Sequence, residues 1–411
     1  MSSRTAGFGE LLSVAAAKKI LASLPITSLA EEEVLLDNSD FRFLSRDLEA
    51  RIDVPHFRKS AMDGYAVRAE DLFGTDYEHP RTLKVIETIH AGDTPQTTVE
   101  DETCAQIATG APLPKGANAV LILEHTEHDK DIVTAFTAVT PNQNVIGIGS
   151  DVEKGTTVFP AGTRLNPRRI GILSALGIQK VWVWKKPRIA IISTGNEILE
   201  PSEPLEPGKI YDINVRSLKH ALWRDGCEVV EIGRISDDPK LIAEAINQST
   251  EQANMVLISG GSSLGEEDYV TSTIKERGTL HVHGIATKPG KPTTIGDVNE
   301  TLVIGLPGHP MSALSIYYIF VRERILQAFG SKAATVRVKA KLARKVVSSL
   351  GRHQFLPVSL TWKEDGALAH PIRKGSSAIS GLALADGFIE ISERTEVTNR
   401  EEEVWVSLFD W

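Results

Sequence analysis

Between Arg188 and Glu197 the chain reads RIAIISTGNE, a strand-length apolar run that stops at a glycine and two polar residues. Helices and further apolar strands alternate after this run. We expect helices at 214–225, 239–253 and 266–277, and strands at 228–235 and 255–259. Strands that are apolar throughout and alternate with helices are typical of a parallel sheet with helices on both faces. The sequence therefore predicts a doubly wound α/β domain over residues 185–330.

Nearly every predicted strand of this domain ends in polar or glycine-rich residues. In parallel sheets ligands bind outside the carboxyl ends of the strands, so we expect these residues to form a site. They are Thr194–Glu197, Asp237 with Asp238, the loop Ser259–Gly265, and Lys288 with Lys291. The glycine-rich loop lacks the Gly-x-x-x-x-Gly-Lys pattern of the common nucleotide phosphate loop, but its backbone N–H groups still suit a phosphate.

Two Pro-Gly pairs near the end of this domain predict type II turns. One lies in TKPGKP (287–292) and the other in GLPGHP (305–310). Lys288 and Lys291 end the first turn within about 7 Å of each other, and two ammonium groups so close favour an anion between them. Pro310 suits the start of a helix reaching 329, whose free N–H groups also favour an anion. One such turn alone would be an ordinary surface turn, but two flanking a single strand favour an oxyanion pocket.

Length and composition fit a multidomain intracellular enzyme. The chain has 411 residues, too many for one core, which suggests three or four domains. With only Cys104 and Cys227 no disulfide framework is expected, as in the reducing cytoplasm. No apolar run reaches the roughly 18 residues of a membrane span, and Met1–Gly9 does not resemble a signal peptide. The net charge of −9 argues against general nucleic-acid binding, although a local cationic cluster is still able to bind an anionic substrate.

The sequence outside 185–330 predicts further units. Residues 10–24 carry one apolar helical face. A β domain is expected at 56–150, with strands at 82–89, 104–108 and 119–123, and a helix opens at Pro167. Short strands return at 336–341, 354–362, 388–392 and 403–408, which predicts a small C-terminal β-barrel.

Four further motifs stand in order along the chain. They are SAMDGYAV (60–67), ATGAPLP (108–114), NVIGIGSD (144–151), and SGG (259–261) with Asp268 and Tyr269. Together with the two Pro-Gly turns they make the chain resemble, from about residue 10 to its end, the molybdenum insertases of the MoeA type. Residues 188–330 resemble the molybdopterin-binding domain of that family. The related eukaryotic form is the C-terminal part of gephyrin.

The resemblance implies a reaction and its substrates. Molybdate is inserted into adenylylated molybdopterin, and the adenylyl phosphate bond is then hydrolysed, which releases AMP and molybdenum cofactor. Molybdate and phosphate are tetrahedral oxyanions, which lysines and backbone N–H groups bind well. Mg²⁺ is the implied cofactor, because a divalent cation held by carboxylates would neutralise the phosphate and polarise the bond to be cleaved.

The resemblance also assigns residues to roles. The implied catalytic residues are Asp63, Thr109, Asp151, Glu197, Lys288 and Lys291. The implied metal ligands are Glu197, Asp237, Asp238 and Asp268. The implied contacts to the molybdopterin substrate are Gly195, Ser259, Gly260, Gly261, Ser262, Ser263, Asp268, Pro289, Gly290, Pro307, Gly308, Pro310 and Ser312.

The family further implies how the units combine. Residues 1–55 and 151–184 form one discontinuous N-terminal domain, in which the helix at 10–24 packs with the later segment. The inserted β domain spans 56–150 and the barrel 331–411. In relatives the inserted domain crosses a two-fold axis, which implies a homodimer with shared sites. The implied protein is cytoplasmic, with molybdopterin adenylyltransferase and apo-molybdoenzymes as handover partners, and it binds neither nucleic acid nor membrane.

Several residues have a second interpretation. Asp237 and Asp238 suit the cap of a helix beginning at Pro239 as well as they suit a site. Glu197 and Asp268 favour a site, because they lie at strand ends. His281 and His283 share a face of a predicted strand. Packing or hydrogen bonding is favoured for them over a role as a pair of metal ligands.

Two other functions compete with the insertase. One is the adenylylation of molybdopterin with ATP, against which the additional domains argue, and the other is a gephyrin-like scaffold that binds a peptide. The chain also departs from the family pattern. Asn196 replaces a usual Asp, which removes a carboxylate, and His309 replaces Asn, the better helix cap. The other departures are Ser262 and Leu264 for valines and Ser377 for a frequent His.

Overall fold

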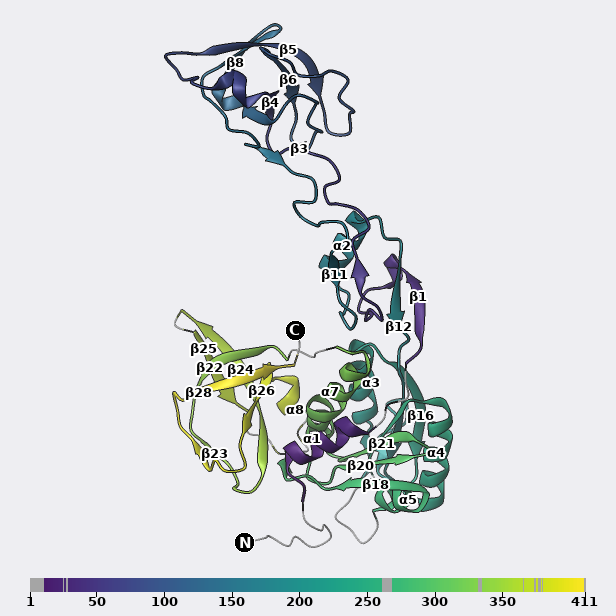
Figure 1. Ribbon diagram of the computed structural model, residues 1–411. Helices are drawn as coiled ribbons and strands as arrows, with labels where there is room; N and C mark the ends of the chain where they lie inside the picture. Colours follow the sequence, from purple (N-terminus) through teal and green to yellow (C-terminus); the bar gives the residue numbers. More distant parts are fainter. Residues whose placement is uncertain are drawn as a thin grey trace.

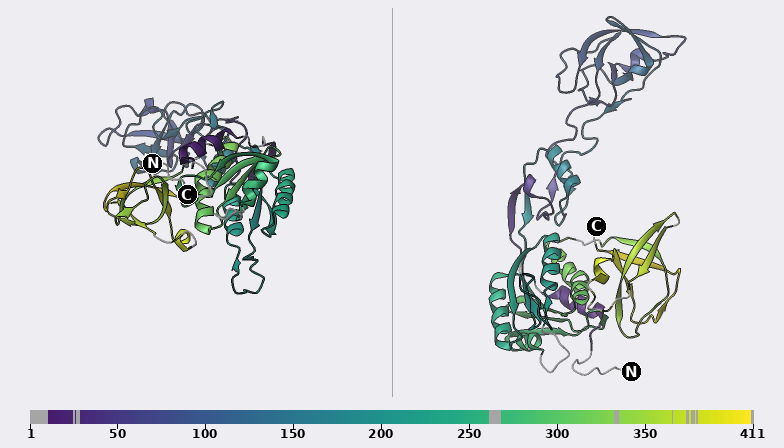
Figure 2. Two further views of the ribbon diagram at one scale, coloured as in Figure 1. Left: turned by 90° about the horizontal axis from the view of Figure 1, so that it is seen from below. Right: turned by 180° about the vertical axis from the view of Figure 1, so that it is seen from behind.

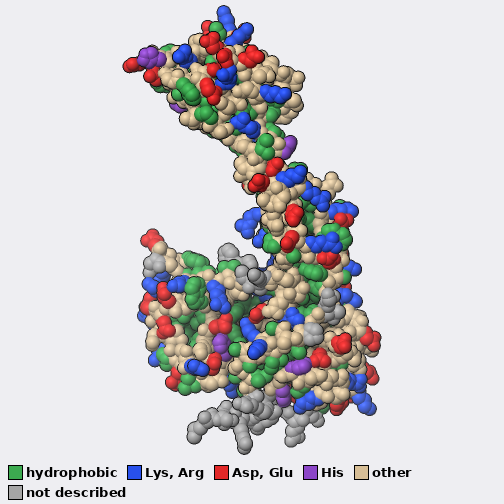
Figure 3. All heavy atoms as spheres, viewed as in Figure 1, with side chains coloured by type: hydrophobic (Ala, Val, Ile, Leu, Met, Phe, Trp, Pro, Cys, Tyr) green, Lys and Arg blue, Asp and Glu red, His purple; other side chains and the backbone are tan. Residues whose placement is uncertain are grey.

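The computed structural model describes residues 11–24, 26, 29–260, 268–331, 335–364, 366–372, 375, 378 and 380–409. The molecule is elongated (Figure 1). A β domain lies at one end, a small unit of strands and one helix lies in the middle, and an α/β body lies beside a β-barrel at the other end. On the face shown in Figure 3 acidic and basic side chains are interspersed.

The α/β body is built on a six-stranded sheet with the strand order β16-β13-β17-β21-β20-β18. The strands are β13 (Arg188–Thr194), β16 (Glu228–Ile235), β17 (Met255–Ser259), β18 (Gly278–His283), β20 (Thr294–Val298) and β21 (Thr301–Leu306). Apolar side chains of α4 (Pro239–Gln252) and α5 (Tyr269–Arg277) cover one face. α3 (Asn214–Arg224) and the helix at 310–328 cover the other. The predicted doubly wound α/β domain is confirmed.

The sheet is not parallel throughout, although the sequence predicted a parallel sheet. β20 runs against both its neighbours, because β20 and β21 form a hairpin. Its two-residue turn, Asn299 and Glu300, has φ of 50° and 60°, and positive φ at both positions is what a type I′ hairpin turn requires. The two Pro-Gly segments therefore flank a hairpin rather than a single strand. Because Thr294 lies opposite Gly305, the hairpin sets the two segments side by side.

The C-terminal strands close into a five-stranded barrel, as predicted. They are β22 (Arg337–Leu342), β24 (His353–Lys363), β25 (Gly366–Pro371), β26 (Gly387–Ile391) and β28 (Glu403–Leu408). Pairing of β24 with β26 closes the ring. The short strand β19 (Thr287–Lys288) pairs in parallel with the start of β24, with Thr287 opposite His353. Backbone hydrogen bonds thus join the barrel to the first Pro-Gly turn.

The β domain at the far end contains a six-stranded sheet with the order β7-β4-β6-β5-β9-β8. Its strands are β4 (Gly64–Val67), β5 (Arg81–Ile89), β6 (Thr103–Ile107), β7 (Ala119–Ile122), β8 (Thr126–Asp129) and β9 (Ile132–Ala135). β3 (Lys59–Ser60) pairs with β10 (Val145–Ile146) where the chain enters and leaves. Figure 2 shows that two chain segments hold this domain away from the rest of the molecule.

Two separated stretches of the chain build the middle unit. β1 (Glu31–Leu35) pairs with β12 (Lys180–Trp184), and β2 (Leu48–Glu49) pairs with β11 (Thr157–Phe159). α2 (Pro167–Ala175) begins at the predicted proline, after Asn166, whose side chain caps it. The core is shared by both stretches and contains Leu36, Leu44, Leu165, Leu173, Val181 and Val183.

α1 (Val14–Ser23) does not lie in this middle unit. Its buried side chains belong to the core of the α/β body, the same cluster that contains Ile285 and Tyr317. The expectation that the helix at 10–24 packs with residues 151–184 is therefore wrong. An amphipathic helix packs where it can cover most apolar surface, and here that surface is the sheet and the helix at 310–328.

The helix predicted from Pro310 onward runs to Ala328. It consists of α6 (Pro310–Ile316), a π-helical segment (Tyr317–Val321) and α7 (Arg322–Ala328). His309 precedes it, and its side chain makes no capping hydrogen bond. Among the described residues no helix has both the length and the apolar character needed to cross a membrane.

Candidate functional site

The first Pro-Gly segment folds against the helix at 310–328. Gly290 has a φ of 105°, the positive value that the prediction requires, but the Lys288–Pro289 peptide bond is cis and the turn of this segment lies one step further on, at Lys291 and Pro292. A Cβ at Gly290 would collide with the side chain of Ile316. Only glycine meets both conditions, because other residues rarely adopt such a φ and would not fit beside the helix. The segment between the two lysines is therefore held close to the body of the protein.

The second Pro-Gly segment is not the type II turn that the sequence predicts. Gly308 does not adopt the left-handed conformation that such a turn needs. Its carbonyl oxygen instead accepts a hydrogen bond from Asn214 Nδ2 (2.7 Å), which also donates to Ser259 Oγ (2.7 Å). Asn214 thus fixes the segment to the end of β17, and the tertiary hydrogen bond overrides the local turn preference.

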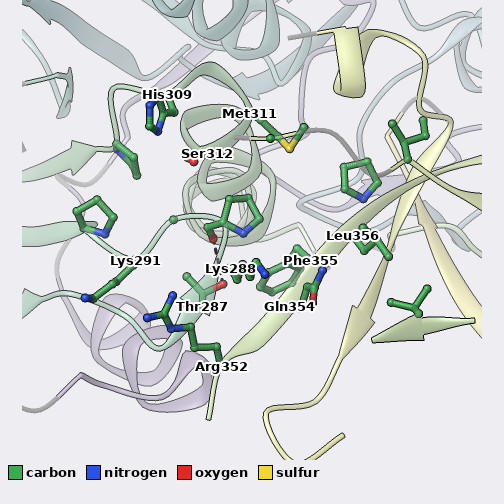
Figure 4. A pocket seen from close by; sticks show the side chains of 18 of the residues that line it. Thr287, Lys288, Lys291, His309, Met311, Ser312, Arg352, Gln354, Phe355 and Leu356 are labelled. Carbon is green, nitrogen blue, oxygen red and sulfur yellow. Dashed lines mark hydrogen bonds between the residues drawn. The ribbon is translucent and has the colours of Figure 1, made fainter. Parts of the chain in front are cut away.

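A cavity of about 580 Å³ lies between these segments and the barrel (Figure 4). The α/β body contributes all of the segment 287–292, Pro307 and His309 of the second segment, and Met311 and Ser312 of α6. Of the residues predicted to bind substrate, it therefore holds Lys288, Lys291, Pro289, Gly290, Pro307 and Ser312. The barrel supplies the opposite wall, which the sequence did not predict. Its apolar part includes Val346, Val347, Phe355, Leu356 and Pro357.

Arg352 brings a third cation into the cavity from the barrel. Burial lowers the pKa of Lys291, and the nearby Arg352 guanidinium lowers it further. Lys288, Lys291 and Arg352 thus place three positive side chains around one space, where like charges destabilise one another. An oxyanion bound in this space would relieve that repulsion and could accept hydrogen bonds from these side chains. The two lysines predicted for an oxyanion pocket therefore line one cavity with Arg352, and that cavity extends across two domains.

Two of the predicted metal ligands serve as helix caps. Asp238 Oδ1 accepts hydrogen bonds from the N–H groups of Lys240 (2.8 Å) and Leu241 (3.2 Å) at the start of α4. Asp268 accepts from the N–H and the hydroxyl of Thr271 (3.0 and 2.7 Å) at the start of α5. Their carboxylates are therefore engaged within the fold.

The other two predicted metal ligands are placed differently. Asp237 keeps one buried carboxylate oxygen without a hydrogen-bond partner in the described structure. Glu197 is exposed on the loop after β13. The two loops touch, since the N–H of Asp237 donates to Asn196 Oδ1 (3.4 Å). Within the part of the chain that the structure describes, no three His, Cys, Asp or Glu side chains lie close enough together to hold a metal ion.

The histidine pair on β18 makes separate contacts. His281 pairs with Asp297, and His283 lies 3.5 Å from Asp268. A bulge in the pairing of β18 with β20 interrupts their simple alternation. Each ring therefore contacts a carboxylate, in line with the favoured interpretation as hydrogen-bonding residues.

The strand ends of β13 and β17 lie very close together. Gly195 has a φ of 149° and Gly260 a φ of 105°, and a Cβ at Gly260 would collide with the carbonyl oxygen of Thr194. Glycine at 260 is thus required by both conformation and space. Gly261, Ser262 and Ser263, which the sequence assigns to substrate binding, lie outside the described residues.

The structure brings together Asp63 and Thr109 in the inserted β domain. Asp63 Oδ1 accepts hydrogen bonds from the N–H (2.7 Å) and the hydroxyl (3.0 Å) of Thr109. These bonds lower the pKa of Asp63, so the carboxylate is kept ionised. Asp151 lies at the connection to the middle unit, where its N–H donates to the carbonyl of Val54 (3.0 Å). None of the three lines the cavity of the same chain.

Three family models match almost the whole chain. They are the MoeA N-terminal region (domain I and II) at residues 12–177, a probable molybdopterin binding domain at 190–327, and the MoeA C-terminal region (domain IV) at 339–409. A molybdopterin molybdenumtransferase of Haemophilus influenzae is 35% identical over 318 residues, which cover 77% of each chain. The chain belongs to the MoeA family.

Further relatives extend the match. Molybdopterin molybdenumtransferase 2 of Mycobacterium tuberculosis is 33% identical and covers 92% of this chain and 93% of its own. A crystal structure of a MoeA protein from Pyrococcus horikoshii is 40% identical and covers 98% of this chain and 100% of its own, with a TM-score of 0.82. The MoeA fold therefore extends over all the units described above.

Within this MoeA-type chain, sequence reasoning missed Arg352. It stands two residues before the predicted strand at 354–362, and nothing nearby in the sequence marks it as a ligand. The signal is the pairing of β19 with β24, which joins residues 66 positions apart as Thr287 and His353. Local sequence patterns do not indicate which distant strand ends will pair, so this contact could not be predicted.

Proposed function

We propose that this chain inserts molybdate into adenylylated molybdopterin, with hydrolysis of the adenylyl phosphate bond and release of AMP and molybdenum cofactor. Membership of the MoeA family supports the reaction class. The observation that carries the proposal is the cavity with Lys288, Lys291 and Arg352 on one side and an apolar wall on the other. Such a site suits an oxyanion next to a ring system.

The residues of the cavity have distinct parts in this proposal. Lys288 and Arg352 attract and orient the oxyanion, because charge-assisted hydrogen bonds to oxyanions are strong. Lys291 is partly buried, so its contact with the oxyanion is less screened by solvent. Phe355 and Leu356 limit the access of water and provide an apolar surface for the molybdopterin ring.

Mg²⁺ fits the acidic strand ends in part. We place it at Asp237, which has a buried carboxylate oxygen without a partner, and at Glu197 on the neighbouring loop. Asp238 and Asp268 orient the helices α4 and α5 beside that point. Carboxylate oxygens are the ligands that Mg²⁺ prefers. When bound, Mg²⁺ would neutralise phosphate charge and polarise the bond to be cleaved.

The inserted β domain suggests a shared site. Asp63 and Thr109 form an ionised, hydrogen-bonded pair that does not line the cavity of its own chain. In the proposed homodimer this pair would complete the site of the neighbouring subunit, since two-fold dimers are the commonest assembly. We further propose a cytoplasmic setting, with a molybdopterin adenylyltransferase supplying the substrate and apo-molybdoenzymes receiving the cofactor.

The test is a defined assay with purified protein. Adenylylated molybdopterin, micromolar molybdate and Mg²⁺ are supplied, and both AMP and molybdenum cofactor are quantified. We expect both products in equal amounts, and about 100- to 1,000-fold less of both from Lys291→Ala. Lys275→Ala removes an exposed lysine from α5 and serves as the matched control, with full activity expected. A wild-type protein that binds neither molybdate nor molybdopterin would contradict the proposal and favour a scaffold.

A further inference from the structure

His353 lies where the barrel meets the first Pro-Gly turn. Its N–H donates a hydrogen bond to the carbonyl of Ala286 (2.8 Å), and its carbonyl accepts one from Thr287 Oγ1 (3.1 Å). On the other side the N–H of Ala286 donates to the carbonyl of Leu12 (2.7 Å). The residues that lead into Lys288 are therefore held between the N-terminal segment and β24.

Two carboxylates face the side chain of His353. Its Nε2 lies 3.1 Å from Glu390 Oε2, and its Nδ1 lies 3.5 Å from Glu393 Oε2. An imidazole with a carboxylate at each nitrogen is satisfied best when both nitrogens carry protons. The hydrogen bond with Glu390 is the main reason that the pKa of His353 is raised, and the same bond lowers the pKa of Glu390.

Several cations surround this group of three. Arg337 of β22 lies 3.8 Å from Glu390. The charge of Lys18 in α1 helps to lower the pKa of Glu390, and the charge of Arg394 helps to lower the pKa of Glu393. Arg352 is adjacent in sequence. Of all these groups His353 alone has an ordinary pKa near neutrality, so it is the one whose charge changes around pH 7.

Arg352 and His353 are consecutive, and consecutive side chains at the start of a strand point to opposite sides. Arg352 lines the cavity, while His353 contacts Glu390 of β26 and Glu393 just beyond it. We propose that His353 is a positioning residue for oxyanion binding: held by the two glutamates, it fixes the start of β24 so that Arg352 faces Lys291. This inference rests on the proposed function of the cavity as the molybdate site.

The proposal gives a pH dependence with a definite sign. A raised pKa means that the folded protein favours the imidazolium, so the contribution of these contacts is complete below the ordinary pKa of histidine. It is lost as the pH rises through the higher pKa of the folded state. Molybdate remains a dianion over this range. The affinity for molybdate should therefore fall several-fold as His353 loses its proton, although the ligand itself does not change.

Calorimetric titration with molybdate alone, from about pH 6 to about pH 8.5, tests this inference. We expect His353→Gln to bind at low pH with the weaker affinity that the wild type shows at high pH, and to lose the pH dependence. His353→Lys keeps a charge beside Glu390 without titrating in this range, so it should retain the strong binding throughout. His281→Gln, which removes another histidine paired with a carboxylate, is the matched control and should behave as the wild type.

Steady-state assays separate positioning from structure. In His353→Gln the KM for molybdate should rise at low pH while kcat changes little. An unchanged affinity and pH profile in His353→Gln would overturn the inference, leaving molybdate binding itself intact. Should that variant unfold, Glu390→Gln removes the same contact at similar size and must also flatten the pH profile. A wild type that does not bind molybdate would instead contradict the proposed function.

Discussion

The cavity beside the barrel and the acidic strand ends of the same sheet differ in how their charges are used. In the cavity Lys288, Lys291 and Arg352 come from two domains and surround one space (Figure 4). At the strand ends Asp238 and Asp268 accept hydrogen bonds from the first turns of α4 and α5. The first region accumulates like charge that a ligand would neutralise, whereas much of the charge in the second is used by the fold.

The difference follows from what comes next along the chain. An aspartate one residue before a helix is a preferred N-cap, so its carboxylate has backbone partners at once. A lysine carries its charge at the end of a long flexible side chain, which holds the ammonium group away from its own backbone. Two lysines and an arginine that line one cavity are therefore a stronger indicator of a ligand than a carboxylate at a strand end.

The largest effect is expected when one positive charge is removed from the cavity beside the barrel. Lys291→Ala should lower insertion activity by about 100- to 1,000-fold, the usual loss when one oxyanion donor is removed. Molybdate binding should weaken with it, while the melting temperature stays near that of the wild type, because surface substitutions usually change stability by less than about 0.5 kcal/mol. Normal cofactor synthesis by this variant, measured beside Lys275→Ala, would remove the oxyanion-pocket argument.

The second prediction tests whether the inserted β domain contributes Asp63 to the site of the neighbouring subunit. Asp63→Ala and Lys291→Ala chains should each have little activity alone. Mixed as heterodimers they should recover activity, because one shared site carries both defects and the other carries neither, so about half of the wild-type activity per dimer is expected. Proven subunit exchange without recovery would mean that each subunit builds its own site, and that Asp63 acts within its own chain or not at all.

Local patterns allowed much of this molecule to be predicted. The strands at 188–194, 228–235 and 255–259 were predictable because a buried parallel strand is apolar throughout. The positive φ of Gly290 was predictable because glycine after proline favours it locally, although the turn itself lies at Lys291 and Pro292. Arg352 and the packing of α1 were not, since both depend on which distant surface an element meets. The Gly308 turn was predicted wrongly because a tertiary hydrogen bond from Asn214 decides its conformation.

The third prediction concerns the cation that the barrel supplies. Arg352→Ala should weaken molybdate binding roughly tenfold, about 1.4 kcal/mol, as expected for the loss of a charge-assisted hydrogen bond. Because the charge of Arg352 contributes to lowering the pKa of Lys291, that pKa should rise in the variant. Chemical modification of Lys291 as a function of pH measures this change. A pKa that stays where it was would place Arg352 too far away to act on the same ligand.

The fourth prediction tests whether carboxylates at the strand ends bind Mg²⁺. Glu197→Gln should raise the Mg²⁺ concentration that half-maximal activity requires, with no change in melting temperature, because its carboxylate is exposed and caps nothing. Asp268→Asn should also raise the Mg²⁺ requirement if its carboxylate reaches the cation. A Mg²⁺ titration of both amide variants decides the point. An unaltered titration would leave Glu197 a contact to the pterin and Asp268 the cap of α5.

The smallest effects separate the two neighbouring aspartates. Asp238→Ala removes the N-cap of α4 and should cost about 1 kcal/mol, or roughly 2–4 °C in melting temperature for a domain of this size, with little change in the Mg²⁺ requirement. Asp237→Ala removes a buried oxygen that has no hydrogen-bond partner in the described structure, so it should not destabilise the fold in this way. It should instead raise the Mg²⁺ requirement, because that oxygen is available to a cation. Thermal melts and Mg²⁺ titrations of the two variants form a matched pair, and the opposite pattern would mean that the cap and the ligand have been assigned the wrong way round.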